Sequence, residues 1–160
     1  MVSVADLTTP GRTMVMGIVN VTEDSFSDGG KWLDRDRAIA HAKELVAQGA
    51  DMIDVGAEST RPGAQRVPAE VEAERIRPVI AALNEEGIRT SVDTMRASTA
   101  LVAAEAGVDM INDVSGGLAD PDMYRVMAET ALPVCLRHWR TVTNADFVNA
   151  SGSADHGGNV

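Results

Sequence analysis

The stretch GIRTSVDTMRASTALVAAEAGVDMINDVSGG (residues 87–117) contains one full unit of the pattern that decides the fold. It begins and ends with short apolar runs of strand character, at 89–92 and 109–114. The apolar residues between the two runs recur at helical spacing and are Leu101, Val102 and Ala106. Gly107 follows the last of them, and glycine is common just past the end of a helix. The stretch therefore predicts a strand, a helix and a second strand.

The same alternation continues on both sides. Three further strand-like runs lie at 13–19, 51–55 and 133–139, with apolar residues at helical spacing between successive runs. Gly49 and Gly87 close two of these helical segments. Strands alternating with helices predict a parallel sheet with helices packed against it. Two architectures fit this order: a doubly wound open sheet, and part of a (β/α)8 barrel, which takes about 250 residues when complete.

No linker divides the chain, so we predict one domain over residues 1–160. Residues 1–12 are an N-terminal extension ahead of the first strand. Residues 141–160 are polar, rich in Gly, Ser and Asn, and aperiodic, which is typical of a long loop or a disordered tail.

The composition excludes several classes of partner. The 160 residues are 44% hydrophobic and 24% charged, as in a globular domain, and carry a net charge of −10. That acidity argues against binding to nucleic acid or to anionic membranes. The single cysteine, Cys135, cannot form a disulfide within the chain, and no run of about 18 apolar residues or signal-peptide pattern is found. We therefore predict a cytoplasmic protein with no nucleic-acid or membrane partner.

Polar side chains stand at the end of every predicted strand. In chain order they are Asn20, Asp54, Asp93, Asn112 with Asp113, and Arg137 with His138. Ligands of parallel α/β folds bind at the carboxyl ends of the strands, so these groups are expected to converge on one site. Taken singly, an Asp or Asn after a strand is more often a turn or capping residue. Their recurrence at the same end of successive strands favours one polar binding site for a small substrate.

Five motifs at these strand ends resemble those of dihydropteroate synthases, enzymes of the folate pathway. MGIVNVTEDSFSDGG (16–30) is similar to the first signature of that family, and DVGAESTRPGA (54–64) to the second. SVDTMR (91–96) and INDVSGG (111–117) resemble the next two strand ends in the expected order. HWR (138–140) resembles the fifth strand end of actinobacterial members. Several long motifs in register make this resemblance specific.

The resemblance implies a fold, a reaction and a cofactor. The implied fold is α/β, a (β/α)8 TIM barrel of which this chain holds only the first five βα units. The implied reaction is a Mg²⁺-assisted transfer in which 4-aminobenzoate displaces diphosphate from hydroxymethyl-dihydropterin diphosphate, giving dihydropteroate. Sulfonamides mimic the aminobenzoate, and the full-length family is typically homodimeric.

The resemblance also implies roles for individual residues. Asp28 and Asp93 are the expected catalytic carboxylates, and Asn20 is expected to offer an oxygen to Mg²⁺, a hard cation. The expected substrate-binding residues are Phe26, Thr60, Arg61, Pro62, Asp93, Asn112 and Val114. Arg61 offers a planar fork of donors to phosphate oxygens, while Asp93 and Asn112 match the N–H groups and ring acceptors of a pterin.

Two departures from the family pattern leave several hypotheses open. Arg137 stands where the family has an apolar Met lining the pterin pocket. The sixth, seventh and eighth strands of the family have no counterpart in these 160 residues. The chain is therefore expected to be the N-terminal portion of a dihydropteroate synthase, inactive alone. The alternatives are an enzyme that completes its barrel with another chain, a non-catalytic pterin- or anion-binding relative, and a pterin-dependent methyltransferase.

Overall fold

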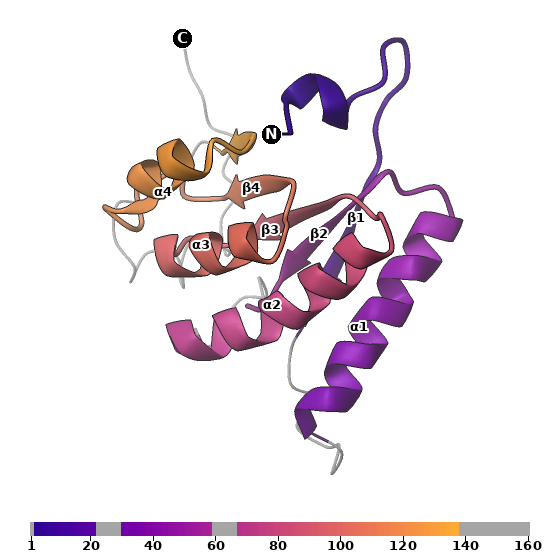
Figure 1. The fold of residues 1–160 in the computed structure, drawn as a ribbon, viewed down its shortest axis with the longest axis horizontal. Helices are drawn as coiled ribbons and strands as arrows, with labels where there is room; N and C mark the ends of the chain where they lie inside the picture. The colour runs from indigo at the N-terminus through magenta and orange to yellow at the C-terminus, as the bar shows by residue number, and fades with distance from the viewer. Residues whose placement is uncertain (1, 22–29, 59–66, 138–160) are drawn as a thin grey trace, which may run out of the picture.

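Parallel strands alternate with helices along the chain, as the sequence predicts. The computed structural model describes residues 2–21, 30–58 and 67–137 (Figure 1). The strands are β1 (Met16–Asn20), β2 (Met52–Gly56), β3 (Thr90–Asp93), β4 (Met110–Asp113) and β5 (Val134–Leu136). The helices are α1 (Gly30–Ala47), α2 (Ala69–Glu85), α3 (Ala97–Glu105) and α4 (Met123–Thr130), with a 3-10 helix, η1 (Val4–Leu7), ahead of β1.

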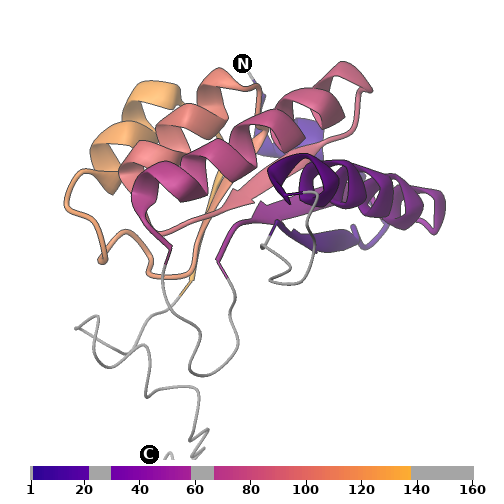
Figure 2. The ribbon, with the colours of Figure 1, turned by 90° about the horizontal axis from the view of Figure 1, so that it is seen from below.

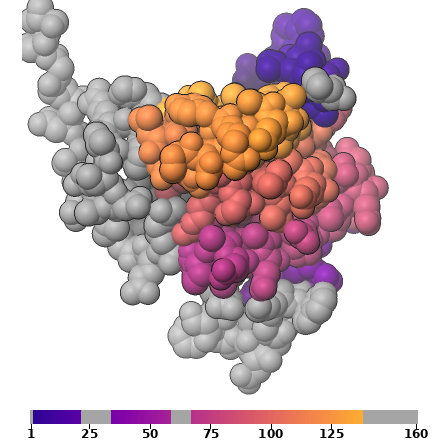
Figure 3. Space-filling model, turned by 60° about the vertical axis from the view of Figure 1, so that its left-hand side comes forward, coloured from indigo at the N-terminus to yellow at the C-terminus, as the bar shows by residue number. Residues whose placement is uncertain are grey.

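The order of the strands decides between the two architectures. The strands are neighbours in chain order, β1-β2-β3-β4-β5, and every neighbouring pair is parallel. A doubly wound sheet reverses its strand order at a switch point, and this sheet does not. Successive helices pack side by side on one face of the sheet (Figure 2), where α2, α3 and α4 form a continuous layer (Figure 3). The fold is therefore that of the first five strands of a (β/α)8 barrel.

The hydrophobic core lies between the sheet and this helical layer. The large fully buried side chains that β2, β3, β4 and α2 contribute include Ile53, Val55, Val92, Ile111, Ile76, Ile80 and Leu83. α3 buries Ala100 and Ala103, whereas Leu101, which was predicted on its buried face, is 40% exposed. Because α3 packs against both α2 and α4, small side chains on its inward face permit close approach. None of the described helices is long and apolar enough to span a bilayer.

β1 differs most from its prediction. The apolar run at 13–19 predicts a strand there, but β1 begins only at Met16, and two of its apolar residues, Met16 and Ile18, are 40% and 64% exposed. Gly17 faces Leu45 of α1, so the alternating residues Met16 and Ile18 point to the opposite side of the sheet. We call this side, away from the helices, the inner face. No described helix packs on it, which explains the exposure of both side chains.

Candidate functional site

Three of the predicted site residues lie in one row across the inner face. The strand register pairs Asn20 with Gly56, Gly56 with Asp93, and Asp93 with Asn112. Paired residues of neighbouring strands point to the same side of a sheet, so Asn20, Asp93 and Asn112 share the inner face. Each stands at or next to the carboxyl end of its strand, where parallel α/β folds bind their ligands.

Gly56 leaves space within this row. A Cβ atom at Gly56 would lie 3.3 Å from Oδ1 of Asn20 and 3.8 Å from Oδ2 of Asp93. The two oxygens therefore border the same small volume above the glycine. A glycine inside a strand often marks a place where a ligand approaches the backbone closely.

A buried carboxylate supports the row from the level below. Asp54 is 4% exposed and precedes Gly56 by two residues, so it lies on the inner face. The Ser91 hydroxyl donates to Oδ1 of Asp54, and Nδ2 of Asn112 donates to Oδ2 of Asp54 at 3.0 Å. We refer to Asp54, Ser91, Asp93 and Asn112 as the inner-face cluster. The sequence indicated Asp54 as a polar strand end without a role, although a charged residue inside an apolar strand is itself a signal.

Asp93 has an unusual electrostatic environment. Burial raises the pKa of its carboxyl to about 7, and the negative charges of Asp54, Glu72 and Asp113 act in the same direction. The positive charge of Arg137 lowers the pKa of Asp93 and so opposes that rise. A carboxyl with a pKa near neutrality accepts a hydrogen bond when ionised and donates one when protonated. Groups shifted this far are concentrated at functional sites.

The other predicted site residues are dispersed or lie outside the described chain. Val114 lies in the turn after β4 and is partly buried, so it offers only an apolar surface. The residues outside the described ranges are Phe26, Asp28, Thr60, Arg61 and Pro62. Their roles stay predictions.

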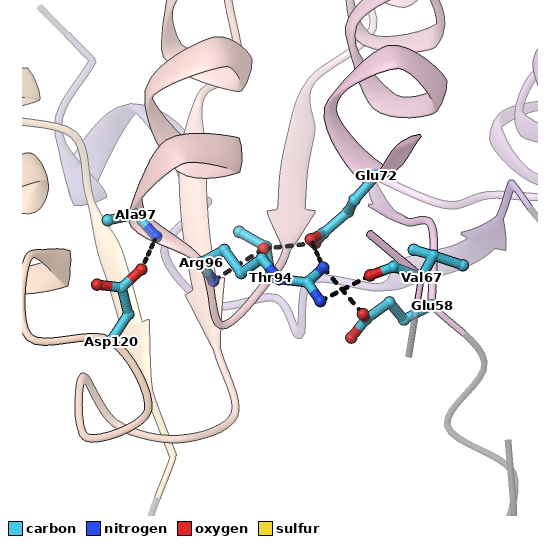
Figure 4. Close-up of polar contacts among 7 residues, drawn as sticks. All are labelled: Glu58, Val67, Glu72, Thr94, Arg96, Ala97 and Asp120. Carbon is cyan, nitrogen blue, oxygen red and sulfur yellow. Dashed lines mark hydrogen bonds and ion pairs between the residues drawn. The ribbon is translucent and has the colours of Figure 1, made fainter. Parts of the chain in front are cut away.

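A second polar cluster joins β3 to the chain on either side of residues 59–66 (Figure 4). We call it the Arg96 cluster; its side chains belong to Glu58, Glu72, Thr94 and Arg96. The guanidinium of Arg96 pairs with Glu72, lies 3.0 Å from Oε1 of Glu58, and donates to the carbonyl oxygen of Val67 at 2.7 Å. The Arg96 side chain therefore contacts the residues on either side of 59–66, the range that contains the predicted Thr60-Arg61-Pro62 segment.

The buried carboxylate of this cluster is fully paired. Glu72 is 1% exposed; Thr94 donates to its Oε1 at 2.6 Å, and Arg96 donates to its Oε2. The backbone N–H of Arg96 donates to the Thr94 hydroxyl at 3.1 Å. Ala97, the first residue of α3, donates its N–H to Asp120 at 2.8 Å. These contacts fix the turn between β3 and α3, directly beyond Asp93.

The oxygens of the row fit a hard metal ion held jointly with a ligand. In the described ranges, no group of three or more His, Cys, Asp or Glu side chains could hold a metal. Asn20 and Asp93 nevertheless direct oxygens to the space above Gly56. Mg²⁺ is commonly bound through one or two protein oxygens, with phosphates and waters completing its shell. The donor chemistry therefore fits Mg²⁺ only together with a phosphate-bearing substrate.

Comparison with known proteins shows the family to which the chain belongs. The profile of the family described as "Pterin binding enzyme" matches residues 16–155. The chain belongs to that family.

Within the family, the chain is similar to dihydropteroate synthases. It is 50% identical to the enzyme of Mycobacterium leprae over 129 residues, which are 81% of this chain and 45% of the relative. The structure of Xanthomonas albilineans dihydropteroate synthase with 4-aminobenzoic acid matches with a TM-score of 0.74 at 45% identity, over 81% of this chain and 48% of that one. The same enzyme in complex with 7,8-dihydropteroate matches with a TM-score of 0.70 at 41% identity, over 82% and 47%. The chain thus spans about half the length of these relatives.

Proposed function

We propose that this chain carries the pterin- and diphosphate-binding strands of a dihydropteroate synthase. The reaction joins hydroxymethyl-dihydropterin diphosphate to 4-aminobenzoate and releases diphosphate. The observation that carries the proposal is the row of Asn20, Asp93 and Asn112 across the inner face. Relatives solved with 4-aminobenzoic acid and with 7,8-dihydropteroate support it, because these are a substrate and the product of that reaction.

The residues of the row, together with Asp28 and Arg61, suit the charges that develop in the reaction. Breaking the C–O bond to diphosphate builds positive charge on the pterin methylene and negative charge on the leaving group. Asp93 and Asn112 hold the pterin ring, and Asp28 stabilises the developing positive charge. Arg61 binds the diphosphate oxygens. Asn20 is the residue that would offer an oxygen to Mg²⁺, which when bound neutralises charge on the diphosphate.

Turnover requires the remaining strands of the barrel. The described sheet holds five strands, and a closed barrel of this type has eight. We infer that the 160 residues by themselves bind substrate incompletely and form no product. The other strands come either from a longer chain or from a second one. A cytoplasmic location and a homodimer of the complete enzyme belong to the same proposal.

The experiment compares two proteins in one assay. The first is the 160-residue chain, and the second is its residues 1–137 fused to the C-terminal half of the Mycobacterium leprae relative. Each is incubated with Mg²⁺, hydroxymethyl-dihydropterin diphosphate and 4-aminobenzoate, and dihydropteroate is quantified. Product is expected from the fusion only. Asn112→Ala should abolish it, whereas Asp36→Asn, an exposed change on α1, should leave it unchanged.

Two other results would change the conclusion. Product from the 160-residue chain alone would show that the missing strands are dispensable or supplied by self-association. A folded fusion that binds pterin without forming product would favour the non-catalytic pterin- or anion-binding relative. The positive charge of Arg137, close enough to lower the pKa of Asp93, is the observation that favours that second candidate.

A further inference from the structure

Asp54 is a buried carboxylate that the proposed reaction does not use. We propose that Asp54 is a positioning residue that holds the Asn112 carboxamide with its oxygen presented to the pterin ring. This inference rests on the proposed function, since it adds to that site a residue that acts through Asn112. It follows from three features of the inner-face cluster: the donors around Asp54, the burial of the group, and an acceptor without a partner.

The first feature is that the carboxylate of Asp54 leaves the amide of Asn112 only one orientation. A carboxamide can rotate by a half turn, which exchanges its oxygen with its NH₂ group. Nδ2 of Asn112 lies 3.0 Å from Oδ2 of Asp54, so the NH₂ group donates there. The reversed amide would set Oδ1 against a carboxylate oxygen, which places two acceptors in contact and loses a charge-assisted hydrogen bond.

The second feature is that Asp54 is itself held in place. The Ser91 hydroxyl donates to its other oxygen, Oδ1. Ser91, Asp54 and Asn112 are 0%, 4% and 8% exposed, so water competes little for these contacts. The three side chains form a chain of hydrogen bonds from β3 through β2 to β4, in which Ser91 and Asp54 lie one level below the row that contains Asp93 and Asn112.

The third feature is an acceptor without a partner. Oδ1 of Asn112 is buried and makes no hydrogen bond to any described residue. An unpaired buried acceptor is unfavourable, and in native proteins such a group calls for an explanation. Asn112 stands beside Asp93 in the sheet register, so two acceptors lie side by side on the inner face. They suit a heterocycle that presents N–H donors on one edge, and a reversed amide would present an N–H group to those donors instead.

A second buried aspartate provides the matched control. Asp113 of β4 is 0% exposed. Unlike Asp54, it accepts its hydrogen bonds from residues of the turn that directly follows it. Oδ1 accepts from the N–H and the hydroxyl of Ser115 at 2.8 and 2.7 Å, and Oδ2 accepts from the N–H of Gly117 at 2.8 Å. Asp113→Asn therefore makes the same chemical change at a buried carboxylate whose hydrogen bonds go to Ser115 and Gly117 instead of to the Asn112 side chain.

The first measurement reports on the amide and needs no pterin. In the ¹⁵N-labelled 160-residue chain, the side-chain NH₂ signals of Asn112 are assigned by their loss in Asn112→Ala. We expect one strongly shifted amide proton with slow exchange, which is lost in Asp54→Asn and kept in Asp113→Asn. A rapidly exchanging Asn112 amide in the unaltered chain would overturn the inference. If Asp54→Asn does not fold, Ser91→Ala should weaken the same protection, and an unchanged signal there would count against the inference.

The second measurement is a double-mutant cycle on pterin affinity. The 160-residue chain and the fusion described above are titrated with 6-hydroxymethylpterin. Asp54→Asn should weaken binding about ten- to a hundredfold when Asn112 is present, and less than about threefold in the Asn112→Ala background. Equal losses in both backgrounds would show that Asp54 does not act through Asn112. A protected amide in proteins that bind no pterin would overturn the proposed function, and with it the ligand named in this inference.

Discussion

The two polar clusters described above both contain a buried carboxylate, but only in the Arg96 cluster is that carboxylate paired with a cation. There, each oxygen of Glu72 has a donor, and one guanidinium lies between Glu72 and Glu58. In the inner-face cluster, two carboxylates stand close together, the pKa of Asp93 is raised to about 7, and Oδ1 of Asn112 has no described partner. A buried carboxylate paired with a cation stabilises the fold, whereas a buried acceptor without a partner at a strand end has bonding capacity left for a ligand. Substitutions in the first should change stability, and substitutions in the second should change affinity.

The largest expected effect is on stability, in the Arg96 cluster. Arg96→Met should lower the free energy of unfolding by about 3–5 kcal/mol, because it leaves the charge of Glu72 buried and uncompensated. Urea unfolding measures the difference. Arg77→Met is the control, since the exposed Arg77 lies 3.8 Å from Glu105 and its removal should cost less than about 0.5 kcal/mol. Similar losses in the two variants would mean that the Arg96 cluster contributes no more than a surface pair.

The next effect is on affinity, in the inner-face cluster. Asp93→Asn should weaken pterin binding about a hundredfold in a form with a complete site, because a carboxylate acceptor for ring N–H groups is lost. Fluorescence titration with 6-hydroxymethylpterin measures it, with Asp36→Asn, the exposed change on α1, as the control. Unchanged affinity would show that Asp93 does not bind the pterin, and that substitutions in the inner-face cluster need not change affinity.

The same carboxyl should make stability depend on pH. The pKa of Asp93 rises from an ordinary 3.8 to about 7 on folding. Between these two pH values, the carboxyl is protonated in the folded chain and ionised in the unfolded chain. The contribution of this carboxyl to stability is therefore highest below about pH 4, falls as the pH rises to about 7, and is level above that. Asp93→Asn lacks this loss, so its stability relative to the parent should improve by a few kcal/mol between pH 4 and pH 8. Urea unfolding at both pH values measures the change, and a difference that does not vary with pH would contradict it.

The smallest expected effect concerns Arg137. Its positive charge lowers the pKa of Asp93, so Arg137→Met should raise that pKa further. The midpoint of the Asp93 carboxyl signal in a ¹³C NMR titration reports the shift. A fall in the midpoint would show that Arg137 does not act on the inner-face cluster as a cation.

Most of the fold was predictable because its signals are local. The strand at 109–114 and the stop at Gly107 follow from residues within one turn or one strand of each other, and both are present. The errors were failures of tertiary context. Leu101 is exposed because the neighbours of α3 require small residues, and β1 is half exposed because no described helix covers the inner face.

The candidate site divides in the same way. Asn20, Asp93 and Asn112 could be chosen from the sequence because polar residues interrupt apolar patterns at strand ends. That they form one row depends on the register between strands, and register is set by how distant segments pack rather than by any one of them. Asp54 shows the difference most clearly. Its sequence neighbours are apolar, and its partners Ser91 and Asn112 are 37 and 58 residues away, so no local pattern identifies them.

The sequence by itself determined the alternation of strands and helices, the family resemblance and the polar strand ends. Periodicity, glycine stops and motifs are properties of contiguous residues, which is why they can be read without coordinates. Only the tertiary structure decided the strand order, the face that each polar group occupies, and which of the buried groups are saturated. Those depend on hydrogen bonds and burial between segments far apart in the chain, where the free energy of an unpaired group is set by its neighbours in space.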